Sequence, residues 1–214
     1  MTQSIRIDLF TDIICPWCLI GTARLDQALA TLPEGVNVEI LHHPFLLDPS
    51  TPQEGENTRK RLKAKYGGDI DAMQARVQTA ARDAGVPLDM SVQPMSYPTI
   101  MPHTLIRSAA PEHQYGLAKA FADAYFLEGR NITDKELLAD IAAEHGFTRE
   151  AALTLIEDEA ENDITKAMAV SASQQGINGV PFFIFNNQFA ISGGQPLEVF
   201  QRAFRVALGE EELT

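Results

Sequence analysis

The chain has 214 residues, of which 45% are hydrophobic and 21% are charged. This is the composition of an ordinary globular protein with one large core, or with a core and an inserted subdomain. The formal net charge of −12 argues against binding to nucleic acid or to anionic membranes, because both need basic patches. The N-terminus lacks the basic and apolar regions of a signal peptide, and no apolar run is long enough to cross a bilayer. We therefore expect a cytoplasmic protein.

The first 50 residues carry strand and helix patterns in alternation. Apolar, β-branched residues over 5–14 predict a strand. Apolar residues at three- and four-residue steps over 19–32 predict a helix, and residues 36–41 predict a second strand. A strand–helix–strand unit of this length places its two strands parallel.

Residues 51–175 carry helical patterns. Residues 92–102 contain three prolines and predict a long loop between helices. Thr133-Asp134-Lys135-Glu136 matches a capping box at the start of another helix. Apolar spacing predicts further helices over 70–84, 103–110, 118–126, 148–156 and 164–171.

Strand patterns return after residue 176. Residues 180–185 predict a strand, Asn186-Asn187 a two-residue turn that tolerates positive φ, and residues 188–192 an antiparallel partner strand. Residues 197–208 predict a final helix. The fold class is therefore α/β: a discontinuous domain over 1–50 and 176–214, interrupted by a helical subdomain over 51–175.

The only two cysteines lie at the junction of the first strand and the first helix, in Cys15-Pro16-Trp17-Cys18. With Cys15 as N-cap, its sulfur faces the free N–H groups of the first turn and the positive end of the helix dipole, which both favour the thiolate. Pro16 then occupies N1, where a missing N–H costs nothing, and Pro16 and Trp17 tune the thiolate. Cys15 is the candidate nucleophile, and Cys18, one turn on, is the candidate resolving thiol.

The sequence also leaves open three purely structural roles for this cysteine pair. The cysteines could be small core residues, a structural disulfide or part of a zinc site. A disulfide here would close a very short loop, and zinc needs four ligands. The adjacent His42 and His43 cannot chelate together, because neighbouring strand residues face opposite sides. We therefore expect no metal site.

The chain resembles the DsbA-like form of the thioredoxin fold, in which a helical subdomain interrupts the fold. Within it, the chain is similar to the FrnE-like branch, related to 2-hydroxychromene-2-carboxylate isomerases and kappa-class glutathione transferases. The stretches that carry the resemblance are Asp12-Ile13-Ile14-Cys15-Pro16-Trp17-Cys18-Leu19-Ile20-Gly21, residues 125–132, Gly176-Ile177-Asn178-Gly179-Val180-Pro181-Phe182-Phe183 and Ser192-Gly193-Gly194-Gln195-Pro196.

The resemblance implies further site residues. Pro181 would be the family's cis-proline, facing the cysteines, and substrate would pair with the main chain at Val180 in a β-addition mode. His103 lies where relatives carry a histidine before a helix, and could line the cleft. The related isomerases and transferases bind glutathione and have serine at the position of Cys15.

We expect a thiol–disulfide oxidoreductase without a tightly bound cofactor, acting on protein or small-molecule thiols and disulfides. Glutathione or a thioredoxin-type protein could supply electrons. One alternative is a glutathione-dependent isomerase or transferase acting on an aromatic or polyketide-like molecule. Another is a chaperone-like binder that uses an apolar groove of the helical subdomain.

Overall fold

The structure is a computed structural model that describes residues 3–212. Its secondary-structure elements are, in chain order, β1 (Gln3–Thr11), α1 (Pro16–Leu29), β2 (Val36–Pro44), β3 (Glu56–Asn57), α2 (Thr58–Tyr66), α3 (Ile70–Asp83), β4 (Met95–Ser96), α4 (Ile100–Ser108), α5 (Pro111–Phe126), α6 (Lys135–Ala143), α7 (Arg149–Glu157), α8 (Glu159–Gln174), β5 (Phe182–Phe185), β6 (Phe189–Ser192) and α9 (Leu197–Ala207).

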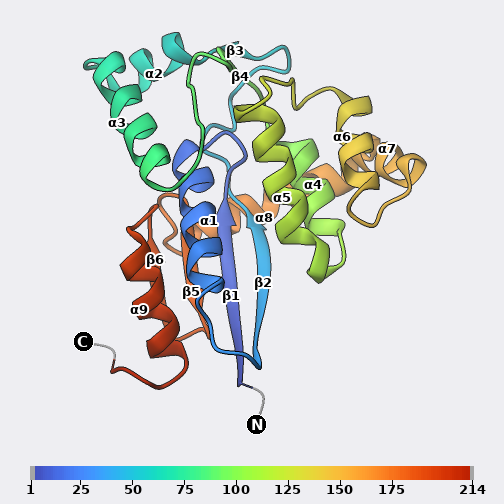
Figure 1. Cartoon of the computed structure of the whole chain (residues 1–214). Coiled ribbons are helices and arrows are strands. Elements are labelled where there is room, and N and C mark those ends of the chain that lie inside the picture. The colour runs from blue at the N-terminus through green and yellow to red at the C-terminus, as the bar shows by residue number, and fades with distance from the viewer. Residues whose placement is uncertain (1–2, 213–214) are drawn as a thin grey trace.

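The central sheet has the strand order β2-β1-β5-β6 (Figure 1). Strand β1 pairs parallel with β2, which confirms the arrangement expected of a strand–helix–strand unit. Strand β5 pairs antiparallel with β1 and with β6. The turn between β5 and β6 has φ of 50° at Asn186 and 54° at Asn187, as the asparagine pair predicts. The N-terminal strand therefore lies inside the sheet, and its end carries the cysteines into the centre of the molecule.

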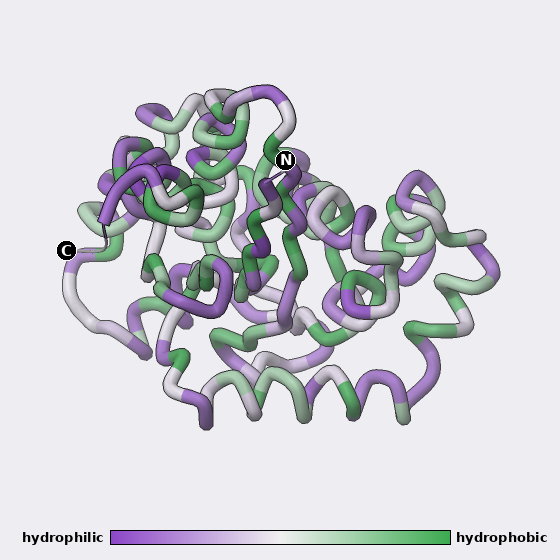
Figure 2. The backbone as a smooth tube through the Cα atoms, turned by 90° about the horizontal axis from the view of Figure 1, so that it is seen from below, coloured by the Kyte–Doolittle hydropathy of each residue, from purple (hydrophilic) through white to green (hydrophobic). Residues whose placement is uncertain are grey.

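Aromatic side chains fill the core between the sheet and the helices α1 and α9. Phe183 meets Phe200 edge to face, with ring centroids 5.0 Å apart. Phe185 meets Phe204 in the same way at 5.6 Å. Figure 2 shows hydrophobic and hydrophilic residues alternating along the helices around the strands, as expected for helices with one buried face.

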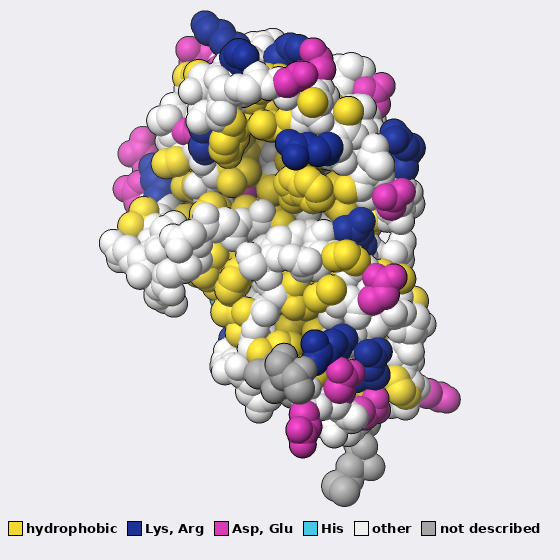
Figure 3. All heavy atoms as spheres, turned by 90° about the vertical axis from the view of Figure 1, so that its left-hand side faces the viewer, with side chains coloured by type: hydrophobic (Ala, Val, Ile, Leu, Met, Phe, Trp, Pro, Cys, Tyr) yellow, Lys and Arg dark blue, Asp and Glu magenta, His cyan; other side chains and the backbone are white. Residues whose placement is uncertain are grey.

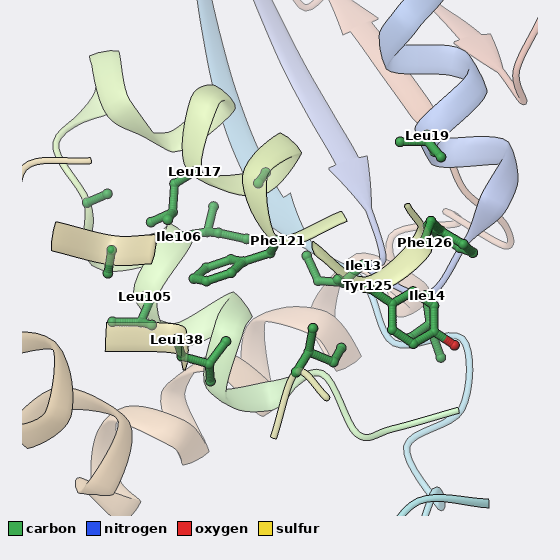
Figure 4. Packing of buried hydrophobic residues seen from close by; sticks show 14 of the residues in the cluster. Ile13, Ile14, Leu19, Leu105, Ile106, Leu117, Phe121, Tyr125, Phe126 and Leu138 are labelled. Carbon is green, nitrogen blue, oxygen red and sulfur yellow. The ribbon is translucent and has the colours of Figure 1, made fainter. Parts of the chain in front are cut away.

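A second core joins the helices between β2 and β5 to the cysteine-bearing end of the sheet. Ile13, Ile14 and Leu19 belong to the first strand–helix unit, yet they share one buried cluster with Leu105 and Phe121 (Figure 4). Helix α8, which the expected boundary at residue 175 assigns to the insertion, packs on β2. The helical segment therefore rests directly on the elements that hold Cys15 and Cys18. Among residues 3–212, the helices are too short or too polar to cross a membrane.

Several predicted boundaries differ from the structure. Helix α5 begins at Pro111, seven residues before the predicted helix over 118–126, and β1 ends at Thr11, three residues before the end of the predicted strand over 5–14. Helix α1 begins at Pro16, as the N-cap position of Cys15 predicts, and ends at Leu29, three residues before the end of the apolar pattern over 19–32.

The predicted loop over 92–102 contains strand β4 and the start of α4. Strand β4 forms because it pairs with β3, with Glu56 opposite Ser96, and such a distant partner leaves no local signal.

The capping box predicted at Thr133 is wrong by one residue. Asp134 is the N-cap of α6, and its Oδ1 accepts hydrogen bonds from the N–H groups of Glu136 at 3.0 Å and Leu137 at 3.4 Å. The Thr133 hydroxyl instead donates to Asn131 Oδ1 at 2.7 Å.

Asp134→Ala is expected to lower the free energy of unfolding by about 1 kcal/mol, because it removes the cap. Thr133→Val is the matched control, and it is expected to cost clearly less because Asp134 keeps capping the helix. Urea denaturation of both variants measures the difference. A larger loss for Thr133→Val would restore Thr133 as the cap.

Candidate functional site

Cys15 occupies the N-cap position of α1, as the motif predicts. Its backbone is extended, with φ of −92° and ψ of 110°, and Pro16 follows as the first helical residue. The Cys15 carbonyl accepts hydrogen bonds from the N–H groups of Cys18 at 3.0 Å and Leu19 at 3.3 Å. The first turn contains no acidic residue. The partial positive charge of the helix end therefore acts on the Cys15 sulfur without a nearby carboxylate in that turn to offset it.

The structure brings Cys15 to the start of β5. Cys15 Sγ donates to the carbonyl oxygen of Val180 at 3.5 Å, and the Val180–Pro181 peptide bond is cis. The thiol and this carbonyl are separated by 165 residues in the sequence. Both are therefore placed by the sheet, because β1 leads to Cys15 and the neighbouring strand β5 begins next to Pro181.

Two glycines allow α1 and the Pro181 segment to approach each other. A Cβ atom on Gly21 would lie 2.9 Å from Pro181 Cγ, and one on Gly194 would lie 3.0 Å from the Trp17 carbonyl oxygen. Arg24 Nη1 donates to the Gly194 carbonyl at 2.7 Å. Side chains larger than hydrogen at either glycine would push these segments apart, which explains why the Gly193-Gly194 turn accompanies the cysteine motif.

A groove of about 470 Å³ opens beside the motif, between Val180 and the helices α2 and α3. Cys15, Pro16 and Trp17 line one wall, and Trp17 is 38% exposed. On the face that carries α3 and α9, hydrophobic side chains gather in a band bordered by charged ones (Figure 3). Most of the groove's remaining lining is apolar, and includes Leu62, Met73, Val77, Met90 and Phe126.

Arg61 is a cation that lines this groove, and two neighbouring carboxylates neutralise its charge. Its guanidinium contacts Asp48 Oδ2 at 3.0 Å and Glu56 Oε1 at 3.6 Å. It also donates to Ser96 Oγ at 2.7 Å. Two carboxylates therefore balance one guanidinium, so the groove selects for apolar contact and hydrogen bonding more than for a strongly anionic ligand.

Cys18 lies behind Cys15 and does not line the groove. Its side chain is buried, and burial, followed by hydrogen bonding to Cys15 and the charge of Cys15, raises the pKa of the Cys18 thiol well above its ordinary value. Cys18 is therefore protonated in the reduced protein at neutral pH, and of the two cysteines only Cys15 lines the groove.

His103 lies elsewhere than the family resemblance suggests. It belongs to α4, its side chain is fully buried, and its Nε2 lies 3.4 Å from Asp12 Oδ1. It is absent from the residues that line the groove. It therefore packs behind the motif, where it cannot touch a molecule bound next to Cys15.

His42 is a buried polar residue near the cysteines. Nothing in the sequence distinguishes it from the adjacent His43. Its ring stacks on His103 with centroids 5.8 Å apart, and its Nε2 is hydrogen-bonded to Thr11 Oγ1. Burial, then the charges of His103 and His43, lower the pKa of His42 well below its usual range. Within residues 3–212, no group of three or more His, Cys, Asp or Glu could hold a metal ion.

The lowered pKa of His42 makes stability depend on pH. Below about pH 6.5 the unfolded chain takes up a proton at this imidazole and the folded chain does not, so the free energy of unfolding is expected to fall by up to about 1.4 kcal/mol per pH unit. Urea denaturation between about pH 5 and pH 7 measures this slope. His42→Gln is expected to flatten it, and equal slopes in both proteins would contradict the assignment.

Comparison with known proteins agrees with this geometry. Residues 6–205 match the DSBA-like thioredoxin domain family. The chain is 31% identical to a probable DsbA oxidoreductase from Streptomyces coelicolor, with a TM-score of 0.84 over 98% of this chain and 92% of that one. It is 26% identical to the protein YwbO of Bacillus subtilis (strain 168), over 94% of this chain and 96% of that protein.

A more distant likeness extends to a 2-hydroxychromene-2-carboxylate isomerase, 18% identical with a TM-score of 0.72 over 97% of this chain and all of that one. The cytosolic disulfide reductase DsbM of Pseudomonas aeruginosa with GSH is 16% identical, with a TM-score of 0.63 over 95% of this chain and 99% of that one. These two show a shared fold. The family match spans both parts of the sheet and the helices between them, and the chain therefore belongs to the DsbA-like thioredoxin-domain family.

Proposed function

We propose that this protein is a thiol–disulfide oxidoreductase in which Cys15 is the nucleophile and Cys18 the resolving thiol. One observation carries the proposal. Cys15 stands at the N-cap of α1 and lies 3.5 Å from the Val180 carbonyl. Both cysteines are buried, each 4% exposed, but only Cys15 lines the groove. We infer that Cys15 is the sulfur that a substrate in the groove would meet.

In the first step, the Cys15 thiolate attacks one sulfur of a substrate disulfide and the other sulfur leaves as a thiolate. The N–H groups at the start of α1 stabilise the negative charge on Cys15 before attack. A substrate backbone lying along the edge at Val180 would hydrogen-bond to the main chain there, which orients its sulfur toward Cys15. Trp17 and the apolar groove wall supply contact area on the other side.

In the second step, Cys18 loses its proton and attacks Cys15 Sγ. A Cys15–Cys18 disulfide forms, and the bond between Cys15 and the substrate sulfur breaks. The cycle runs in reverse when the oxidised pair accepts a substrate thiol. We propose glutathione or a thioredoxin-type protein as the electron donor and the cytoplasm as the location, where thiols are kept reduced.

Trapping tests the assignment of the two roles. Cys18→Ala is expected to accumulate a stable mixed disulfide between Cys15 and a peptide or insulin disulfide, because no second thiol resolves it. Mass spectrometry measures the adduct. The double variant Cys15→Ser with Cys18→Ala is the matched control and should carry none. Trapping through Cys18 in Cys15→Ala would reverse the two roles and contradict the proposal.

A second candidate function rests on the size and lining of the groove. A volume of about 470 Å³ with apolar walls suits a small aromatic molecule, as a glutathione-dependent isomerase or transferase would need. Calorimetry with glutathione tests it on the Cys15→Ser variant. Tight glutathione binding together with wild-type protein that exchanges no disulfides would favour this second function over the first.

A further inference from the structure

The exchange cycle needs a proton acceptor for Cys18, and this inference rests on the proposed function. Cys18 is buried, and burial is the first of the causes that raise the pKa of its thiol. The thiol form is a poor nucleophile. A group close to Cys18 that takes its proton would therefore speed its attack on the mixed disulfide on Cys15.

A small cavity lies on the inner side of Cys18, away from the groove. Its volume is about 20 Å³, and about 10–15 Å³ is enough to admit one water molecule where polar partners are present. Cys18, Thr11, Asp12 and His42 are among its lining residues. The cavity therefore has the size for one water molecule, and both Cys18 and polar residues line it.

His42 offers a free acceptor next to this cavity. Its Nε2 is hydrogen-bonded to Thr11 Oγ1, whereas its Nδ1 is buried without a hydrogen-bond partner among the described protein atoms. A buried polar nitrogen without a partner is costly, and a water molecule in the cavity would satisfy it. When Nε2 carries the ring proton and donates to Thr11, Nδ1 is the lone-pair acceptor.

Asp12 is the rival acceptor, and each of its oxygens already has a polar neighbour, whereas Nδ1 of His42 has none among residues 3–212. Its Oδ2 accepts from the Leu47 N–H at 2.7 Å, and its Oδ1 lies 3.4 Å from His103 Nε2. Its charge also opposes ionisation of Cys18.

The other ionisable groups near the cavity are occupied as well. Lys119 is paired with Asp26. Tyr115 donates to Asp26 Oδ1 at 2.8 Å, and burial raises its pKa. His43 is bonded to Asp8 at 2.8 Å. Nδ1 of His103 is also buried without a partner in the described part of the chain, but His103 does not line the cavity. Of these two histidines with an unpartnered Nδ1, His42 is therefore the one that lines the cavity beside Cys18.

We propose that His42, through one water molecule in this cavity, accepts the proton of Cys18 as Cys18 attacks Cys15. The water gives a proton to His42 Nδ1 and takes the proton of the thiol. The Cys18 thiolate then bonds to Cys15 Sγ, and the substrate sulfur leaves with the electron pair of the broken bond. Burial keeps the resting imidazole neutral, so Nδ1 is free to accept at the start of the step, and His42 holds the proton only transiently. In the reverse direction, the proton returns through the same water to Cys18.

Stopped-flow reaction of the reduced protein with dithiobis(nitrobenzoate) separates the two chemical steps. Attack by Cys15 releases a first coloured thiolate, and resolution by Cys18 releases a second. Excess reagent makes the first step fast, so the second phase reports Cys18 alone. The leaving thiolate needs no proton, so the pH dependence of this phase belongs to the protein.

His42→Gln is expected to slow the second phase at neutral pH by at least about tenfold and to leave the first phase unchanged. In that variant the second phase should rise steeply with pH, because hydroxide replaces the imidazole, whereas the wild-type rate should be nearly flat. Ala118→Val keeps His42 but fills the cavity with methyl groups, and it should give the same steep profile. It also serves as the second test if His42→Gln folds poorly.

The matched control is His103→Gln, which alters a buried histidine stacked on His42 that does not line the cavity. Its two phases are expected to match the wild type. An unchanged second phase and pH profile in His42→Gln would overturn the inference. A tenfold slower second phase in Asp12→Asn would also overturn it, because the Asp12 carboxylate would then be the proton acceptor. A wild-type protein that releases no first thiolate would instead overturn the proposed function.

Discussion

Cys15→Ser is expected to abolish disulfide exchange, lowering the rate of insulin reduction by glutathione at least about a thousandfold, to the uncatalysed background. A hydroxyl oxygen cannot form the mixed disulfide through which exchange proceeds. Cys18 is not expected to take over the role, because it does not line the groove. The turbidity of the reduced insulin chains measures the rate.

Serine is a well-suited replacement because it keeps the fold intact. It is nearly the size of cysteine and is a preferred N-cap residue, so the free energy of unfolding should stay the same or rise slightly. Loss of activity in a stable variant is then a loss of chemistry. Substantial exchange by Cys15→Ser would show that another group reacts with the disulfide.

The second large effect is expected at Gly21, one turn beyond the motif. An alanine Cβ there would lie 2.9 Å from Pro181 Cγ and 3.3 Å from Phe183 Cζ, closer than ordinary van der Waals contact. Overpacking of this kind costs about 1–3 kcal/mol, which exceeds the gain of up to about 1 kcal/mol from alanine in a helix. Gly21→Ala should therefore lower the free energy of unfolding.

Gly21→Ala should also lower the exchange rate by about tenfold, because the Pro181 segment moves away from Cys15 and geometry of this kind is sensitive to small displacements. Gly116→Ala in α5 is the matched control. Its Cβ would lie 3.3 Å from the His145 ring, a half-buried side chain that can move aside. Denaturation and insulin reduction should show it to be as stable and active as the wild type. Equal behaviour of the two variants would contradict the role given to Gly21.

Several features of the site and of the sheet depend only on residues that are close together in the chain, and these could be predicted from the sequence. The N-cap role of Cys15 and the place of Pro16 depend on residues next to each other in the chain. The parallel pairing of β1 with β2 depends on a helix-length connection, and the turn at Asn186 depends on two residues that tolerate positive φ.

Other features depend on residues that are distant in the chain. The contact between Cys15 and Val180 could be expected only through the likeness to a known fold, because nothing near either residue indicates it. The burial of His103 and the pairing of β3 with β4 follow from packing across the molecule. Thr133 matches a capping pattern, and the competing bond to Asn131 excludes it from that role.

The sequence alone determined the candidate cysteine pair, the order of the main strands and helices, and the place of Cys15 at the start of α1, because each follows from neighbours along the chain. The tertiary structure alone decided which surfaces meet at that pair. The groove against α2 and α3, and the small cavity lined by Cys18 and His42, form only once the helices between β2 and β5 pack on β2 and share a core with Ile13, Ile14 and Leu19. Burial sets the protonation of Cys18 and His42, and burial is a property of the assembled chain.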